Sequence, residues 1–217
     1  MQMKDHLQLL AGVCPPPAFA KMLITLLFSA TAFAGQFVSL TNAPPTNVSS
    51  PILLTGGGVI FQGVQSGGRG TSLWYKLSPD INGNYRNGTW TQIASFPPGY
   101  TPLFYASAVL PDGRVIVEGG EYNGSGGAVW TNKGAIYDPV ANTWTSVNPP
   151  VGWSSIGDAQ SAVLPNGTFM VANALTSQQA LLDPIHLTWT IVGNGKADSN
   201  NEEGWTYCRV ATCSRSM

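Results

Sequence analysis

The sequence predicts an all-β fold built from repeated four-stranded antiparallel units. A hairpin pattern recurs three times at a nearly constant spacing, and no helical period or heptad pattern appears after residue 35. The composition agrees with this prediction, because 25 glycines, 16 prolines and seven tryptophans suit many short strands that are joined by turns.

The middle copy of the repeat, residues 107–145, contains all four expected strands. A Pro-Asp-Gly sequence supplies the tight turn between the first two strands, and a Gly-Gly pair ends the second. An Asp-Pro turn separates the last two. Four antiparallel strands of this kind form one blade of a β-propeller. The four strands are expected at Ser107–Leu110, at Val115–Val117, at Ala135–Tyr137 and from Trp144 onward.

Two further copies align with the middle one. Ser107–Val117 recurs as Ser161–Val171, 54 residues later, and Leu110–Gly119 matches Leu54–Gly63, 56 residues earlier. Each copy also carries a tryptophan in its last strand, which we interpret as a core residue: Trp90, Trp144 and Trp189. The predicted blades cover 51–98, 105–150 and 158–194, and another blade is expected to start at 202.

In the middle copy an apolar run is followed in order by Gly119-Gly120, Tyr137, six further residues and Trp144. This pattern resembles that of the Kelch-repeat β-propellers, the superfamily that includes the central domain of galactose oxidase. The resemblance covers about residues 50–206, with Leu77 in place of the tyrosine in blade one and Asn173-Ala174 in place of the diglycine in blade three. It implies an incomplete Kelch-type propeller of about three blades and the start of a fourth.

The first 34 residues have the pattern of a leader with a secretory signal peptide. Lys21 precedes the apolar run Met22–Phe28, and Ala32-Phe33-Ala34 forms a cleavage site before Gly35. The apolar run is too short for a membrane span, which needs about 20 residues. We therefore expect a secreted protein, extracellular or periplasmic, with no membrane span in the mature chain, with Met22 as a candidate initiator and residues 35–50 as a linker or first strand.

Residues 207–217 do not continue the repeat. If one base is restored beside the Thr206 codon, possible codons for these residues can spell LLPGGNVFTVD, which resembles VLPDGRVIVEG at 109–119. Our hypothesis is that 207–217 is a frameshifted tail and that the chain is a fragment of a longer propeller. Open blade faces would then make it prone to self-association.

Charge and cysteine positions exclude several classes of function. The chain has 10 Lys+Arg and 11 Asp+Glu, a formal net charge of −1, so neither nucleic acid nor an anionic membrane surface is an expected partner. Cys14, Cys208 and Cys213 all lie outside the repeats, which excludes a disulfide framework for the blades.

The resemblance implies one metal-dependent activity, because copper oxidases of the superfamily bind copper through two Tyr and two His, with one Tyr cross-linked to a Cys. Here the histidines are His6, in the leader, and His186, which we interpret as an exposed turn residue, and no Cys lies between Gly35 and Thr206. We therefore predict no metal, no cofactor and no catalytic residue.

Three acidic residues have two interpretations. Glu118 precedes the diglycine, and Asp158 and Glu202 precede the first strands of successive blades. They either face a central channel, where they act as acid and base on a sugar, or accept hydrogen bonds from backbone amides between blades. We favour the second interpretation.

Aromatic residues in the connections are the best candidates for a binding site. Tyr100, Tyr122 and Trp153 are predicted to bind a ligand, and Tyr105 and Trp130 share their position outside the regular repeat. The predicted function is a secreted scaffold that binds carbohydrate or a cell-surface protein ligand. The alternative is a carbohydrate-active enzyme, a sugar epimerase or oxidase, with its site on blades that this chain lacks.

Overall fold

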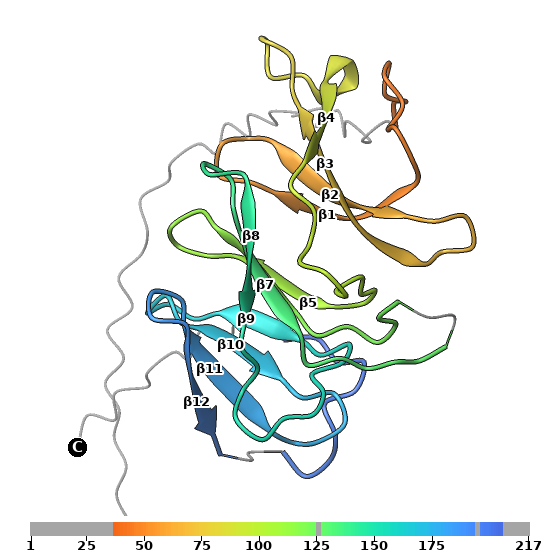
Figure 1. Cartoon of the computed structure of the whole chain (residues 1–217). Helices are drawn as coiled ribbons and strands as arrows, with labels where there is room; N and C mark the ends of the chain where they lie inside the picture. The colour runs from red at the N-terminus through yellow and green to blue at the C-terminus, as the bar shows by residue number, and fades with distance from the viewer. Residues whose placement is uncertain (1–36, 125–126, 194–195, 206–217) are drawn as a thin grey trace, which may run out of the picture. The chain divides into compact units, whose positions relative to one another are not determined.

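The computed structural model describes residues 37–124, 127–193 and 196–205, which form three four-stranded antiparallel sheets in the orders β1-β2-β3-β4, β5-β6-β7-β8 and β9-β10-β11-β12 (Figure 1). This confirms the predicted all-β propeller blades. The predicted leader and tail lie outside the described residues. The strands are β1 Val48–Leu53, β2 Val59–Val64, β3 Gly70–Ser78, β4 Thr89–Ile93, β5 Ala106–Val109, β6 Val115–Glu118, β7 Gly134–Asp138, β8 Thr143–Val147, β9 Ser161–Val163, β10 Phe169–Ala172, β11 Gln179–Asp183 and β12 Thr188–Val192, and a short 3₁₀ helix spans Tyr85–Asn87.

The first hairpin of each blade closes on the same glycine turn. Gly57, Gly113 and Gly167 have φ values of 81°, 87° and 87°, a region that a residue with a Cβ enters only with strain. The amide of Gly113 donates to Leu110 O at 2.9 Å. The sequence alignment of the three copies therefore corresponds to one repeated backbone conformation.

The last hairpins of blades two and three close on an aspartate. Asp138 Oδ1 accepts hydrogen bonds from the amides of Val140 and Ala141, at 2.8 and 3.0 Å. Asp183 Oδ1 does the same for the two amides that follow it at the matching positions. The side chain of His186 is 72% exposed and its Nδ1 lies 2.8 Å from Asp183 Oδ2, so this histidine is a turn residue as predicted.

The core consists of two hydrophobic clusters that blade two separates. One cluster joins blade two to blade one and the other joins it to blade three. Alternate residues of β6 and β7 point into different clusters, because successive side chains of a strand face opposite sides of the sheet. Val115, Val117, Ala135 and Tyr137 lie in the first cluster, and Ile116 and Ile136 lie in the second.

The repeated tryptophans connect each blade to the segment before it. Trp144 Nε1 donates to Ala94 O, just after β4, at 3.1 Å, and Trp189 Nε1 donates to Asn148 O, just after β8, at 2.6 Å. Trp90 makes the same bond to Asn42 O at 3.0 Å. All three rings are half-buried. Trp144 and Trp189 pack against the two clusters, at the edge of the predicted core. Trp90 belongs to neither cluster and lies against Phe61, with ring centroids 5.1 Å apart.

Candidate functional site

The segments 94–105, 119–124 with 127–133, 148–160 and 196–205 define what we call the connection face, and three of these connections are hydrogen-bonded to one another. The amide of Gly120 donates to Gly157 O at 2.7 Å, and the amide of Glu121 donates to Leu103 O at 3.0 Å. Backbone bonds thus join residues from two blade-to-blade connections to the long connection of blade two. Groups that project from these segments have fixed relative positions.

The diglycine of blade two allows this close approach. A Cβ on Gly119 would lie 2.5 Å from Gly157 O, and a Cβ on Gly120 would lie 2.5 Å from Pro102 Cβ. Both glycines also have positive φ, 75° and 118°. Any other residue at either position would push the connections apart, so the Gly-Gly signal of the repeat is a packing requirement at the connection face.

Three aromatic residues of these connections lie outside the buried core, and we call Phe104, Tyr122 and Trp130 the aromatic platform. Phe104 is 62% exposed and its ring centroid lies 5.8 Å from that of Tyr122, edge to face. Trp130 is 38% exposed, and its ring lies beside Gly157. A Cβ atom added to Gly157 would lie 3.9 Å from this ring. Exposed rings on a backbone held in this way are suited to stacking against a ligand.

Three acidic side chains influence the hydroxyl of Tyr122. A hydrogen bond to the Glu121 side chain, together with the charges of Glu121, Asp158 and Glu202, raises the pKa of the Tyr122 phenol. Asp158 Oδ1 is buried and has no hydrogen-bond partner among the described residues. The three carboxylates therefore make the surroundings of the Tyr122 hydroxyl negative.

Tyr100 and Trp153, the other two predicted ligand-binding residues, occupy equivalent buried positions. They are 2% and 5% exposed, and each closes a turn in which its amide donates to a proline carbonyl, Pro97 O at 3.2 Å or Pro150 O at 3.1 Å. The Tyr100 hydroxyl donates to Gly119 O at 3.0 Å. Contact with a ligand would require either ring to leave its site, so the functional argument below rests on Tyr122.

Two other predicted candidates lie in or beside the core. Tyr105 is half-buried and packs against the cluster between blades one and two, where burial raises the pKa of its phenol. Glu118 is fully buried opposite Gly134, and a Cβ on that glycine would overlap the carboxyl group. Neither Glu118 oxygen has a hydrogen-bond partner among the described residues. Neither sequence interpretation of Glu118, a channel-facing acid or an acceptor for backbone amides, therefore describes it.

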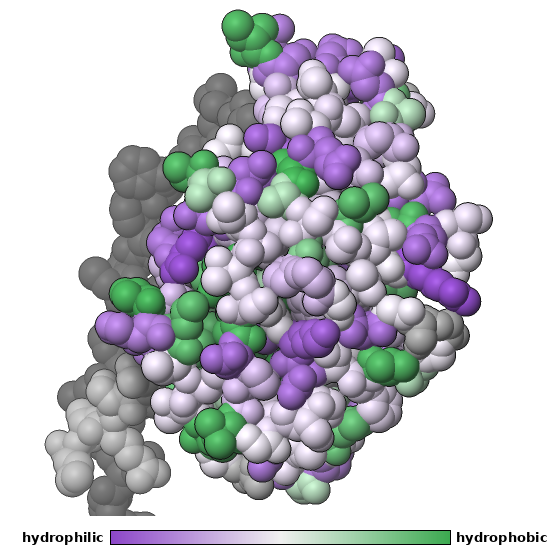
Figure 2. All heavy atoms as spheres, in the orientation of Figure 1, coloured by the Kyte–Doolittle hydropathy of each residue, from purple (hydrophilic) through white to green (hydrophobic). Residues whose placement is uncertain are grey.

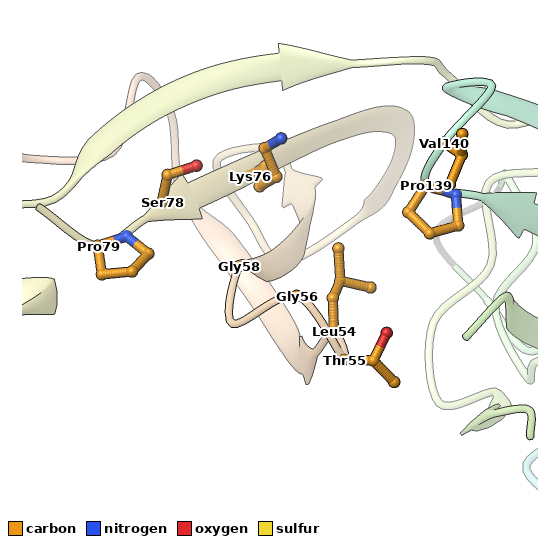
Figure 3. A pocket seen from close by; sticks show the side chains of 9 residues that line it. All are labelled: Leu54, Thr55, Gly56, Gly58, Lys76, Ser78, Pro79, Pro139 and Val140. Carbon is orange, nitrogen blue, oxygen red and sulfur yellow. The ribbon is translucent and has the colours of Figure 1, made fainter. Parts of the chain in front are cut away.

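The opposite ends of the blades carry two shallow hollows at successive blade junctions. The first, of about 350 Å³, lies between the β1–β2 turn and Pro139-Val140 of blade two (Figure 3). The second, of about 390 Å³, repeats this geometry between the turns of blades two and three. Lys76 is the one charged side chain that lines the first hollow, so it offers little chemistry. These hollows are gaps between adjacent turns.

The surface contains no extended apolar or charged patch in the view of Figure 2, where hydrophobic side chains occur singly or in small groups among polar ones. In the described parts of the chain, no three His, Cys, Asp or Glu side chains are arranged so that they could hold a metal ion. No helix within residues 37–124, 127–193 or 196–205 has the length and hydropathy needed to cross a membrane.

Comparison with solved structures places the blades among known propellers. The structure titled "Structure of YjhT" has a TM-score of 0.52 and 20% identity, and the match covers 72% of this chain and 54% of YjhT. The chain shares the β-propeller fold. It spans about half the length of YjhT. A fungal alcohol oxidase of the AA5 family, solved in complex with copper, matches at a TM-score of 0.43 and 16% identity over 67% of this chain and 32% of that chain. At this similarity it supports no functional argument.

No protein-family model matches the sequence, and no curated protein matches it either.

Proposed function

We propose that the protein is a Kelch-type binding scaffold that recognises carbohydrate through the aromatic platform. The observation that carries this proposal is the edge-to-face pair of Phe104, which is exposed, and Tyr122, which is half-buried, on connections that are hydrogen-bonded to one another. Sugar rings present C–H faces that stack on aromatic rings, and their hydroxyl groups donate to carboxylates.

The chemistry of the face supports binding better than catalysis. Among the described residues, the acidic groups near Tyr122 are not gathered into a group that could hold a metal. Glu118, the one carboxyl that is fully buried among the described residues, lies inside blade two and reaches no surface. Rings that can stack and carboxylates that can accept hydrogen bonds are suited to recognition.

Glycan binding by variants tests this proposal. The secreted chain is probed with neutral oligosaccharides by calorimetry, and Tyr122→Ala is expected to weaken binding about tenfold because one stacking ring is worth about 1–1.5 kcal/mol. Ile81→Ala is the control, since Ile81 is an exposed apolar residue of the β3–β4 connection, outside the connection face. Equal binding by Tyr122→Ala and the parent chain, or no binding by either, contradicts the proposal.

Secretion belongs to the same proposal, because extracellular carbohydrate is accessible only to an exported protein. The leader pattern at Lys21 and Ala32-Phe33-Ala34 supports export. N-terminal sequencing of the product from a secretory host is expected to find Gly35 as the first residue. A mature protein that begins at Met1 or Met22 would overturn this part.

A further inference from the structure

Resting on the export that belongs to the proposed function, we infer that Asn47 is a modification site and carries an N-linked oligosaccharide in the exported protein. Asn47-Val48-Ser49 has the Asn-x-Ser/Thr form of a glycosylation acceptor. Three other segments share this form: Asn87-Gly88-Thr89, Asn123-Gly124-Ser125 and Asn166-Gly167-Thr168. The fold gives the asparagine side chains of these three segments a structural role and leaves that of Asn47 without one.

Asn123 joins two connections through its side chain. Its Oδ1 accepts from the Thr101 amide at 2.8 Å, and its Nδ2 donates to Gly99 O at 3.2 Å. The residue is also half-buried. A sugar on Nδ2 would place a bulky group between the connections and disturb the contact with Gly99, so this position is not suited to a glycan.

The other two asparagines act in their own turns. Asn87 Oδ1 accepts from Thr41 Oγ1 at 3.0 Å, which holds the segment before β1 on blade one. Asn166 Oδ1 accepts from the Thr168 amide at 3.1 Å, and Asp112 caps the matching turn of blade two in the same way. An aspartate cannot carry an N-linked glycan, so the turn alone explains why a residue of this shape stands at position 166.

The side chain of Asn47 is exposed and engaged by nothing. Its backbone carbonyl accepts from the Val64 amide at 2.8 Å, which fixes the main chain beside the end of β2. Its side-chain amide has no hydrogen bond to any residue in the described parts of the chain. The next residue is Val48, so no Asn-Gly turn explains the asparagine. A glycan is bulky and hydrated, and Asn47 offers it a fixed backbone with an open side chain.

The modification transfers an oligosaccharide from a polyprenyl diphosphate donor, which a secretory pathway supplies together with the transferase. Asn47 Nδ2 forms a bond to C1 of the first sugar, and the bond between C1 and the diphosphate oxygen breaks. The electron pair of that bond leaves with the diphosphate, and Nδ2 loses a proton, so nothing is oxidised or reduced. Ser49 supplies the hydroxyl group at the third position, which the acceptor sequence requires.

Peptide mass spectrometry of the exported protein tests this inference. The full chain is produced in a eukaryotic secretory host, purified from the medium and treated with peptide-N-glycosidase, which converts a glycosylated asparagine to aspartate. We expect conversion of Asn47 and none of Asn87, Asn123 or Asn166. Asn47→Gln and Ser49→Ala should each abolish the shift in gel mobility that the glycan causes, and Ser49→Thr should keep it. The matched control Asn166→Gln should migrate as the parent chain does.

The outcomes that overturn the inference differ from failure of the proposed function. If the exported chain begins at Gly35 and Asn47 is not converted, the inference is wrong while export stands. Equal conversion of all four asparagines would also overturn it, because the fold would then make no selection among them. If the chain stays inside the host, both export and the inference are wrong. Circular dichroism of each variant checks that a lost glycan is not a lost fold.

Discussion

At the scale of single residues, Glu118 departs most from ordinary side-chain chemistry. Its equivalent in blade one is Gln62, which is also fully buried and whose Nε2 donates to Thr71 O and Pro102 O at 2.8 and 2.9 Å. The position thus accepts a polar side chain of this size, and blade one fills it with a neutral amide. In blade two, burial without a hydrogen-bond partner raises the pKa of Glu118 well above its usual range.

Glu118→Gln is expected to increase stability at neutral and alkaline pH. Burial raises the pKa of Glu118 in the folded state, so its carboxyl makes its full contribution to stability at pH values below the pKa of the unfolded chain, near 4.3. This contribution is lost as the pH rises through the pKa of the folded state. Between these two pKa values the free energy of unfolding falls by about 1.4 kcal/mol per pH unit. Glutamine does not titrate, so urea unfolding should show a shallower fall in stability with pH for the variant. Parallel pH profiles for the two proteins would contradict the assignment.

Residue-level prediction from sequence was correct for the turns but not for the exposure of two aromatic residues. Local chemistry alone determines the conformation at Gly113 and Asp138, so the sequence was sufficient there. Tyr100 and Trp153 are buried, although their place in connections predicted exposure. A signal was present, because both follow a glycine in a Pro-Pro-rich segment and lie 53 residues apart, close to the blade period. Recurrence at that period indicates a structural residue.

At the scale of elements, the outer strands of blades two and three are each connected to the blade before them through one tryptophan. Both backbone groups of Ala94 are held by blade two: its carbonyl accepts from Trp144 Nε1 and its amide donates to Asn142 Oδ1 at 3.0 Å. The centroid of the Trp144 ring also lies 4.5 Å from that of Phe96 and 5.1 Å from that of Trp74. This strand therefore combines ring packing with two directed hydrogen bonds.

Trp144→Phe separates these two contributions. The phenyl ring keeps most of the aromatic packing but leaves Ala94 O without its donor, so we expect a loss of about 1–2 kcal/mol in the free energy of unfolding. Trp144→Ala also removes the ring and should cost about 3–5 kcal/mol. Ser146→Ala, at an exposed position of β8, should stay within about 0.5 kcal/mol of the parent. Equal losses for the Phe and Ala variants in denaturant titrations would refute the role of the hydrogen bond.

Sequence patterns predicted the elements of each blade but not the contacts between blades. The hairpins of β5 to β8 follow from β-branched runs and turn residues, which act locally. The carbonyls of Ala94 and Asn148, which accept from the tryptophans, belong to segments with no motif of their own. The same reason hid the ring pair of Phe104 and Tyr122, because these residues belong to separate connections that meet only in the folded chain.

At the scale of the whole molecule, stability is organised as contacts between neighbouring blades. Blade two contributes one face to each of the two hydrophobic clusters, and blades one and three meet it on opposite sides. In arrays of this kind, the free energy of unfolding is approximately a sum of unit stabilities and nearest-neighbour interfaces. A substitution on one face of blade two should therefore weaken one neighbour more than the other.

A pair of substitutions in adjacent strands of blade two tests this. Ile136→Ala removes side-chain volume from the cluster shared with blade three, and Val117→Ala does so in the cluster shared with blade one. Ile136→Ala should cost about 2–5 kcal/mol and Val117→Ala somewhat less. By hydrogen exchange, the first should accelerate exchange most in β10 and β11, and the second most in β2 and β3. Uniform acceleration over all three sheets in both variants would mean that the blades unfold as one cooperative unit, and nearest-neighbour coupling would then be the wrong description.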